Sequence, residues 1–144
     1  MPSIYIQNTE TQLVLDLKEG EGEDELPSVV MWEYHGGPNQ LWEYKDGMIY
    51  SKANGYIYIS KIYWLMKLVL DLNEESGEIS VFEAHGGPNQ KWSFDEDGTI
   101  RSEVQDDMVL DVFEASTEAG TKVVAFTKHG GANQIFKIVT VDEE

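Results

Sequence analysis

The stretch His35–Trp42 reads HGGPNQLW, and the phrase returns as HGGPNQKW from His85 and as HGGANQIF from His129. Two consecutive glycines are poor material for a strand or a helix, because glycine loses more conformational freedom on folding than any other residue. The phrase occurs three times in a chain of 144 residues, which indicates an internal repeat.

The repeat extends to both sides of the phrase. Its units run roughly over 1–44, 45–94 and 95–141. They fill almost the whole chain and predict a single domain over residues 1–144. Each unit also carries an upstream segment with Asp in its fourth position: LVLDL (Leu13–Leu17), LVLDL (Leu68–Leu72) and MVLDV (Met108–Val112). Between this segment and the phrase lie VVMWEY, ISVFEA and VVAFTK, respectively.

Alternation with a period of two predicts short strands and assigns their faces. In the first unit the leucines of Leu13–Leu17 share one face, and Asp16 points to the other. In the next segment Val29 and Met31 face inward while Trp32 faces outward. The same pattern predicts outward carboxylates and rings in the other units, at Asp71 and Asp111 and at Phe82 and Phe126.

A further strand is expected to contain the end of the phrase, where Gln40, Trp42 and Tyr44 share an inward face. Each unit thus contributes one large aromatic residue at an equivalent inward position. Three units of about four strands are too few for a propeller, and one unit alone could not bury its apolar face. We expect an all-β, closed barrel of pseudo-threefold symmetry, with these residues near its axis: Trp42, Trp92 and Phe136.

The three copies of Gln-x-Trp, each with its upstream Asp and an aromatic residue eight positions before the Gln, resemble the ricin B-chain-like (R-type) lectins. The resemblance covers nearly the full chain. It implies a β-trefoil with one sugar pocket in each lobe. The chain departs from the family pattern by Phe136 in place of Trp, by the absence of cysteine, and by Phe in place of Trp32 at the outward position of the second and third lobes.

Sugar binding needs a flat apolar plate and a few fixed polar groups, because a hexose offers a patch of C–H groups and a rim of hydroxyls. Candidate plates are the outward aromatic residues Trp32, Phe82 and Phe126. Candidate polar groups are the carboxylates Asp16, Asp71 and Asp111, the amides Asn39, Asn89 and Asn133, the imidazoles His35, His85 and His129, and the orienting amides Gln40, Gln90 and Gln134.

Structural alternatives stay open at this point. Each His could cap its Gly-Gly turn without touching a ligand, each Asp could satisfy nearby amides, and each outward ring could be an ordinary surface aromatic. The acidic run Glu19–Glu25 is more typical of a solvated loop than of a calcium site, because it lacks regular ligand spacing. No metal and no other cofactor are therefore expected.

The charge balance excludes several classes of partner. The 27 acidic and 10 basic residues give a formal charge of −17, which repels nucleic acid and anionic membrane surfaces. The longest apolar run is too short to span a bilayer, so no membrane insertion is expected. With no cysteine and no leader-like start, we expect a cytoplasmic protein, and leaderless secretion remains compatible.

One segment does not fit the repeat. Gly47 and Asp71 are separated by 24 positions, whereas Gly98 and Asp111 are separated by 13, so the second unit carries about eleven extra residues. This insertion, over residues 53–64, contains Tyr56, Tyr58, Tyr63 and Trp64. It is expected either to pack back on its own barrel as a hairpin or to join two chains as a homodimer.

The sequence therefore favours a lectin that recognises galactose or N-acetylgalactosamine, a preference that comes from the resemblance alone. The alternative is a β-trefoil protein-binding module, a protease inhibitor or scaffold acting through divergent loops, although three nearly identical turns argue against it. The sequence contains no nucleophile–base pair and no metal cluster of the kind that would indicate an enzyme.

Overall fold

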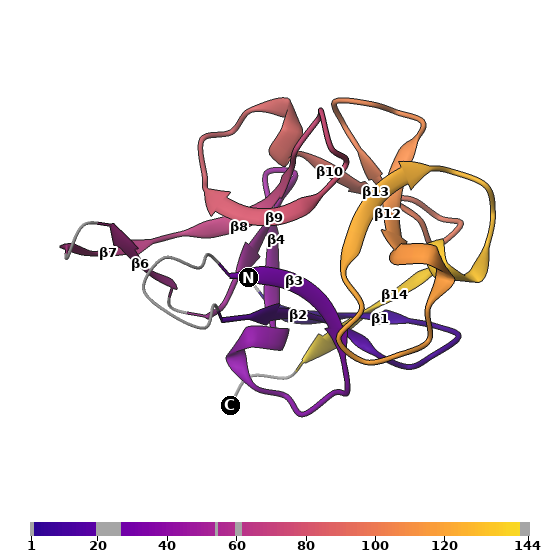
Figure 1. The fold of residues 1–144 in the computed structure, drawn as a ribbon, viewed down its shortest axis with the longest axis horizontal. Helices are drawn as coiled ribbons and strands as arrows, with labels where there is room; N and C mark the ends of the chain where they lie inside the picture. Colours follow the sequence, from indigo (N-terminus) through magenta and orange to yellow (C-terminus); the bar gives the residue numbers. More distant parts are fainter. Residues whose placement is uncertain (1, 20–26, 54, 60–61, 142–144) are drawn as a thin grey trace.

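The computed structural model describes residues 2–19, 27–53, 55–59 and 62–141. Strands dominate this part of the chain, and the predicted all-β, β-trefoil architecture is confirmed (Figure 1). The strands are β1 (Ser3–Asn8), β2 (Val14–Lys18), β3 (Ser28–Trp32), β4 (Trp42–Lys45), β5 (Met48–Ser51), β6 (Gly55–Ile59), β7 (Ile62–Met66), β8 (Leu68–Leu72), β9 (Ile79–Glu83), β10 (Trp92–Phe94), β11 (Ile100–Ser102), β12 (Met108–Val112), β13 (Val123–Thr127) and β14 (Phe136–Val141).

Three equivalent hairpins, β2–β3, β8–β9 and β12–β13, are arranged around the centre of the molecule in Figure 1. Their registers correspond, since Leu15 opposes Met31 and Leu70 opposes Val81. The hairpins also contact one another. β3 pairs with β9, Val30 of β3 bridges to Lys122 just before β13, and Glu78 just before β9 bridges to Val124 of β13. Each hairpin therefore caps the same end of the barrel.

The barrel wall is formed by β1, β4, β5, β10, β11 and β14. β1 pairs with both β14 and β4, β4 with β5, and β10 with β11. The backbone N–H of Trp92 donates to the Gly47 carbonyl at 2.8 Å, and that of Phe136 donates to the Gly98 carbonyl at 2.8 Å. These two bonds tie β10 and β14 to the turns of the preceding strand pairs.

The inward faces predicted from alternation are confirmed. Leu15, Val29 and Met31 are buried, and they share one core cluster with Trp42, Trp92 and Phe136. The indole Nε1–H groups of Trp42 and Trp92 donate to the backbone carbonyls of Leu15 and Leu70 at 3.2 Å. Each indole thus joins the barrel wall to the hairpin of its own lobe.

The strand expected over Gln40–Tyr44 starts later than predicted. Pro38–Gln40 forms a short 3-10 helix, η1, and β4 begins only at Trp42. Equivalent turns occur at η2 (Pro88–Gln90) and η4 (Ala132–Gln134), and another 3-10 helix, η3, covers Phe113–Ala115. The proline at the first helical position explains η1 and η2, because its fixed φ suits a helical turn and its missing N–H costs nothing there.

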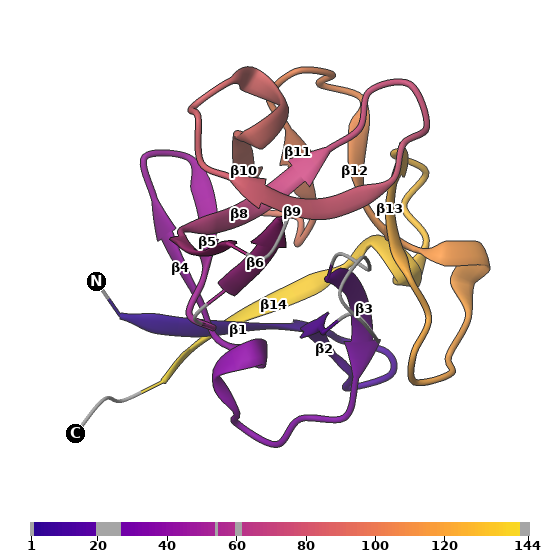
Figure 2. The ribbon, with the colours of Figure 1, turned by 60° about the vertical axis from the view of Figure 1, so that its left-hand side comes forward.

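The insertion forms the hairpin β6–β7 between the barrel strands β5 and β8. Among the described residues these two strands pair only with each other, and the hairpin projects to the left of the body in Figure 1 and toward the viewer in Figure 2. Asn54 and residues 60–61 lie outside the described residues. No helix of the described chain is long and apolar enough to cross a membrane.

The Trp Nε1–H bonds give a prediction about stability. Trp92→Phe should keep the fold, because Phe136 fills the equivalent position of the third lobe. It should lower the free energy of unfolding by about 1–3 kcal/mol through lost volume and an unpaired Leu70 carbonyl, against about 3–5 kcal/mol for Trp92→Ala. Urea unfolding measures both values. Equal losses for the two variants would contradict this account of the core.

Candidate functional site

The two glycines of the repeated phrase have different structural roles. Gly36 has φ +78°, a left-handed conformation that favours glycine. Gly37 has ordinary φ, but a Cβ there would lie 2.7 Å from Cε1 of His35 and 2.9 Å from Oδ1 of Asn39. The first glycine is needed for the turn and the second for two side chains that fold against it. The same holds at Gly86 and Gly87, and at Gly130 and Gly131.

The histidine at the start of each phrase caps the turn and also faces the carboxylate. Nδ1 of His35 accepts the N–H of Gly37 at 3.0 Å, so the neutral ring carries its proton on Nε2. That Nε2 lies 4.0 Å from Oδ2 of Asp16. His85 and His129 repeat both contacts, with Nε2 to Oδ2 distances of 4.0 Å to Asp71 and 3.6 Å to Asp111. Each His therefore caps its turn, and its second ring nitrogen faces the Asp; its contact with a ligand stays a prediction.

The glutamine that ends each turn joins the loop to the strand. Nε2 of Gln40 donates to Oδ2 of Asp16 and to the Glu33 carbonyl, both at 2.8 Å, while its Oε1 accepts the N–H of His35 at 2.8 Å. In the second lobe Gln90 donates to Asp71 at 3.0 Å and accepts from His85 at 2.9 Å. In the third lobe Gln134 donates to Asp111 and accepts from His129, both at 2.9 Å.

The carboxylates are less exposed than predicted. Asp16 lies on the outer side of β2, away from the core cluster, yet only 5% of its surface is exposed, and Asp111 is 4% exposed. The Asp71 side chain is 16% exposed. The expectation of fully outward carboxylates is therefore wrong. The turn folds back over the strand and places the Gln amide on the carboxylate, which alternation along a single strand cannot reveal.

Burial has an electrostatic consequence in the third lobe. It raises the pKa of the Asp111 carboxyl above its ordinary value, because a charge is harder to hold away from water. The hydrogen bond from Gln134 and the nearby His129 oppose this shift and favour the charged form. No buried side-chain nitrogen or oxygen of the described residues lacks a hydrogen-bond partner.

The aromatic residues stand out from the surface as predicted. Trp32 is 45% exposed, Phe82 53% and Phe126 54%. Phe82 and Phe126 lie edge-on to the histidine of the same lobe, with ring centroids 6.4 Å from His85 and 6.1 Å from His129. Each ring is thus about half exposed at the surface, and in the first lobe Trp32 lines the same pocket as Asp16.

The asparagine amides differ in the hydrogen bonds they make, although Asn133 of the third lobe also interacts with the Asp111 carboxylate and opposes the rise in its pKa that burial causes. Nδ2 of Asn39 donates to Oδ1 of Asp16 at 3.1 Å. Nδ2 of Asn89 donates to the Leu72 carbonyl at 3.3 Å, and that of Asn133 to the Val112 carbonyl at 3.2 Å. In the first lobe the Asn, Gln and Asp side chains therefore form one connected group.

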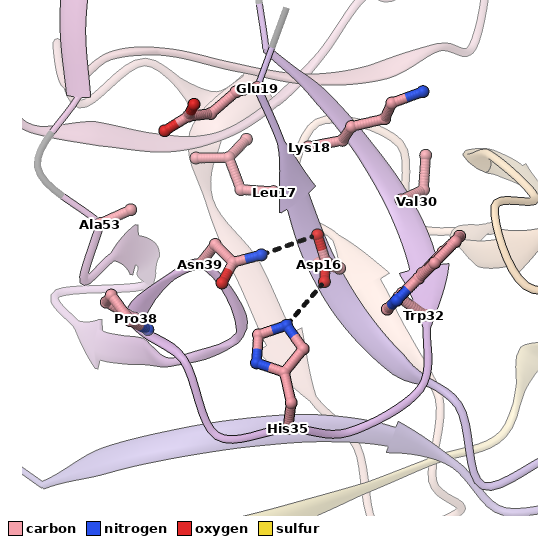
Figure 3. Close-up of a pocket in the computed structure, with 10 residues that line it drawn as sticks. All are labelled: Asp16, Leu17, Lys18, Glu19, Val30, Trp32, His35, Pro38, Asn39 and Ala53. Carbon is pink, nitrogen blue, oxygen red and sulfur yellow. Dashed lines mark hydrogen bonds and ion pairs between the residues drawn. The ribbon is translucent and has the colours of Figure 1, made fainter.

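The first lobe contains a pocket of about 590 Å³ (Figure 3). The predicted residues Asp16, Trp32, His35 and Asn39 line it together, whereas Gln40 lies fully buried beneath them. Sequence reasoning missed further lining residues: Leu17, Lys18, Glu19, Val30, Pro38 and Ala53. The period of two could have identified Lys18, which shares the face of Asp16. Ala53 gave no signal, because it comes from the next unit of the repeat.

This arrangement suits a neutral ligand that carries several hydroxyls. The carboxylate accepts hydrogen bonds from hydroxyls, and the amide and imidazole groups supply further donors and acceptors. The aromatic ring supplies an apolar plate. No group of three or more potential metal ligands occurs within the described ranges. Most of the acidic run Glu19–Glu25, from Gly20 onward, lies outside them.

The raised pKa of Asp111 gives a prediction about stability against pH. The folded chain holds the Asp111 proton more tightly than the unfolded chain, so this contribution is complete below the ordinary aspartate pKa and is lost as pH rises through the folded value. Relative to Asp111→Asn, the unfolding free energy of the wild type should therefore fall between about pH 3.5 and 7. Urea unfolding of both proteins at several pH values measures the difference, and a rise with pH would contradict the assignment.

Several proteins of known structure are similar to this chain over almost its whole length. The chain is 27% identical to the C-terminal half of an earthworm R-type lectin solved with GalNAc, with a TM-score of 0.74 over 98% of this chain and 100% of that chain. A mutant of the earthworm lectin C-terminal domain, solved with 6′-sialyllactose, is 25% identical, with a TM-score of 0.73 and the same coverage. An exo-β-1,3-galactanase from Clostridium thermocellum is 25% identical, with a TM-score of 0.71 over 98% of this chain but 30% of that chain.

No curated protein matches the sequence. The model of the ricin-type β-trefoil lectin domain family does match, over residues 2–136, which include all three copies of the phrase. Together with the three equivalent hairpins and the threefold Asp–Gln contact, this match shows that the chain belongs to the ricin-type β-trefoil lectin domain family.

Proposed function

We propose that this protein binds glycans that carry galactose or N-acetylgalactosamine, through up to three sites related by the repeat. The observation that carries the proposal is the pocket of the first lobe, where a carboxylate at the floor lies beside an exposed indole. A pyranose ring can use both groups, because its hydroxyls donate to the carboxylate while its C–H face packs on the indole.

The physical argument starts from the carboxylate. Gln40 and Asn39 each hold one oxygen of Asp16, so the group is fixed before a ligand arrives and loses little entropy on binding. A fixed carboxylate can accept hydrogen bonds from two adjacent hydroxyls, and hydrogen bonds to a charged group contribute about 1.5–3 kcal/mol each. The C–H face of the same ring would stack on Trp32.

The relatives support the choice of sugar. One earthworm lectin structure holds GalNAc and another holds 6′-sialyllactose. The first covers the whole of this chain's fold at 27% identity, so the likeness extends beyond architecture. The preference for galactose-type sugars in this chain is inferred from those ligands and from the shared Gln-x-Trp pattern.

The three sites should differ in strength. Indole offers a larger stacking area than phenyl, and only the first lobe has Trp at this position. The first lobe also has the Asn39 to Asp16 hydrogen bond, whereas Asn89 donates to a backbone carbonyl. We infer the order of affinity to be the first lobe above the second and third.

The proposed role is binding without catalysis. The match to the galactanase covers 30% of that enzyme's chain and leaves most of it unmatched, which supports a binding role for the shared part. A homodimer through the β6–β7 hairpin stays a prediction, and sedimentation analysis of the wild-type chain would test it.

The carboxylate gives a test of the first site. Asp16→Asn keeps the shape of the side chain and an oxygen that can accept from Gln40, so the fold should persist while the charged acceptor is lost. We expect about a tenfold loss of affinity for GalNAc at the first site, about 1.4 kcal/mol. The Trp32 indole N–H resonance, titrated with GalNAc by NMR, reports this site.

Asp71→Asn is the matched control, because it makes the same change in the second lobe and should leave the Trp32 titration as in the wild type. If neither galactose nor GalNAc at about 10 mM, roughly ten times a dissociation constant near 1 mM, moves the Trp32 resonance of the wild type, the proposed function is wrong.

A further inference from the structure

The pocket of the first lobe continues beyond the group formed by Asp16, Trp32, His35 and Asn39. Its lining extends along the end of β2 to Lys18 and Glu19 and across to Ala53 at the start of the next repeat unit. Accepting the proposed function, we propose that this extension is a second subsite, which takes the neighbouring neutral sugar of an oligosaccharide.

Size is the first argument. The pocket measures about 590 Å³. This volume lies in the middle of the roughly 300–1,000 Å³ range of pockets that enclose drug-sized molecules. A monosaccharide has about a dozen heavy atoms and would fill only the part between Asp16 and Trp32, whereas a disaccharide has nearly twice as many and would occupy the extension.

The placement of the lining residues is the second argument. Asp16 and Lys18 share the outer face of β2, and Asn39 lies between Asp16 and the Ala53 side of the pocket in Figure 3. The Glu19 carboxylate is directed toward that same side. A sugar bound there would meet a carboxylate acceptor from Glu19, and the apolar surfaces of Ala53 and Pro38 would lie below its C–H groups.

The other lobes have the same repeated Asp, His and Asn, but the residues around this group differ. The position of Lys18 is taken by Asn73 in the second lobe and by Phe113 in the third. In the third lobe the chain also turns away, because Glu114 at the position of Glu19 has φ 54° inside η3. The position of Ala53 is taken by the larger Val104 next to the second lobe, with the same backbone N–H to Ser Oγ bond. The second lobe keeps a Glu at the place of Glu19, Glu74, but the combination of Glu19 with Lys18 and the small Ala53 occurs only in the first lobe.

Charge indicates that the second sugar is neutral. Glu19 and Asp16 place two carboxylates in one pocket, and the chain as a whole has a formal charge of −17. Lys18 supplies one positive charge against these two. A sulfated or sialylated sugar would bring a further negative charge toward Glu19 and would be repelled.

The Trp32 indole N–H resonance, identified by its loss in Trp32→Phe, isolates the first site from the others. Methyl β-galactoside and a panel of galactose-terminated disaccharides (lactose, N-acetyllactosamine, melibiose and Galβ1-3GalNAc) are titrated in parallel. At least one disaccharide should bind about fivefold or more tightly than methyl β-galactoside, the gain of one or two net hydrogen bonds.

The variant Glu19→Ala should reduce this ratio of affinities toward one. Glu74→Ala is the matched control, because Glu74 holds the same place in the second lobe, and it should leave the ratio at Trp32 as in the wild type. A ratio near one for every disaccharide in the wild type, or an unchanged ratio in Glu19→Ala, overturns the second subsite.

Three other results separate the claims. If neither methyl β-galactoside nor GalNAc moves the Trp32 resonance, the proposed function fails and the second subsite fails with it. If methyl β-galactoside binds but the disaccharides gain nothing, only the second subsite is wrong. If 6′-sialyllactose binds more tightly than lactose, the inference of a neutral second sugar is overturned.

Discussion

The contact between one Gln amide and one Asp carboxylate, made once in each lobe, is the constraint on which the rest of the site depends. The Gln lies at the end of a 3-10 turn and the Asp lies in the first strand of the hairpin. Their bond therefore fixes the turn over the strand. It also buries the carboxylate and sets its orientation, and the His ring approaches the same oxygen that the Gln amide holds.

The glycines make this contact possible. Gly36 allows the left-handed bend, and Gly37 leaves room for the His35 ring and the Asn39 side chain. The His ring then closes the turn by accepting the Gly37 N–H. The residues of the phrase HGGxNQ thus constrain one another through these contacts. This explains why the phrase recurs three times in the chain with so little variation.

The lobes share this unit and differ around it. The plate is indole in one lobe and phenyl in two, and the residue two places after the Asp is Lys18, Asn73 or Phe113. The repeat therefore preserves the geometry proposed to hold a first sugar, while Lys18 and its counterparts lie where a longer ligand is proposed to continue. None of these substituted positions belongs to the core cluster.

The sequence by itself determined the repeat, the all-β trefoil and the core faces, because alternation and spacing are local properties that Leu15, Met31 and Trp32 display directly. It also identified four residues that line the first pocket, Asp16, Trp32, His35 and Asn39. Only the tertiary structure decided how deeply Asp16 and Asp111 are buried and that Ala53 of the next unit lines the pocket of the first. It also decided that β4 begins after the turn. The reason is physical: a period of two tells which side of a strand a residue occupies, but not which loop from elsewhere in the chain folds over that side.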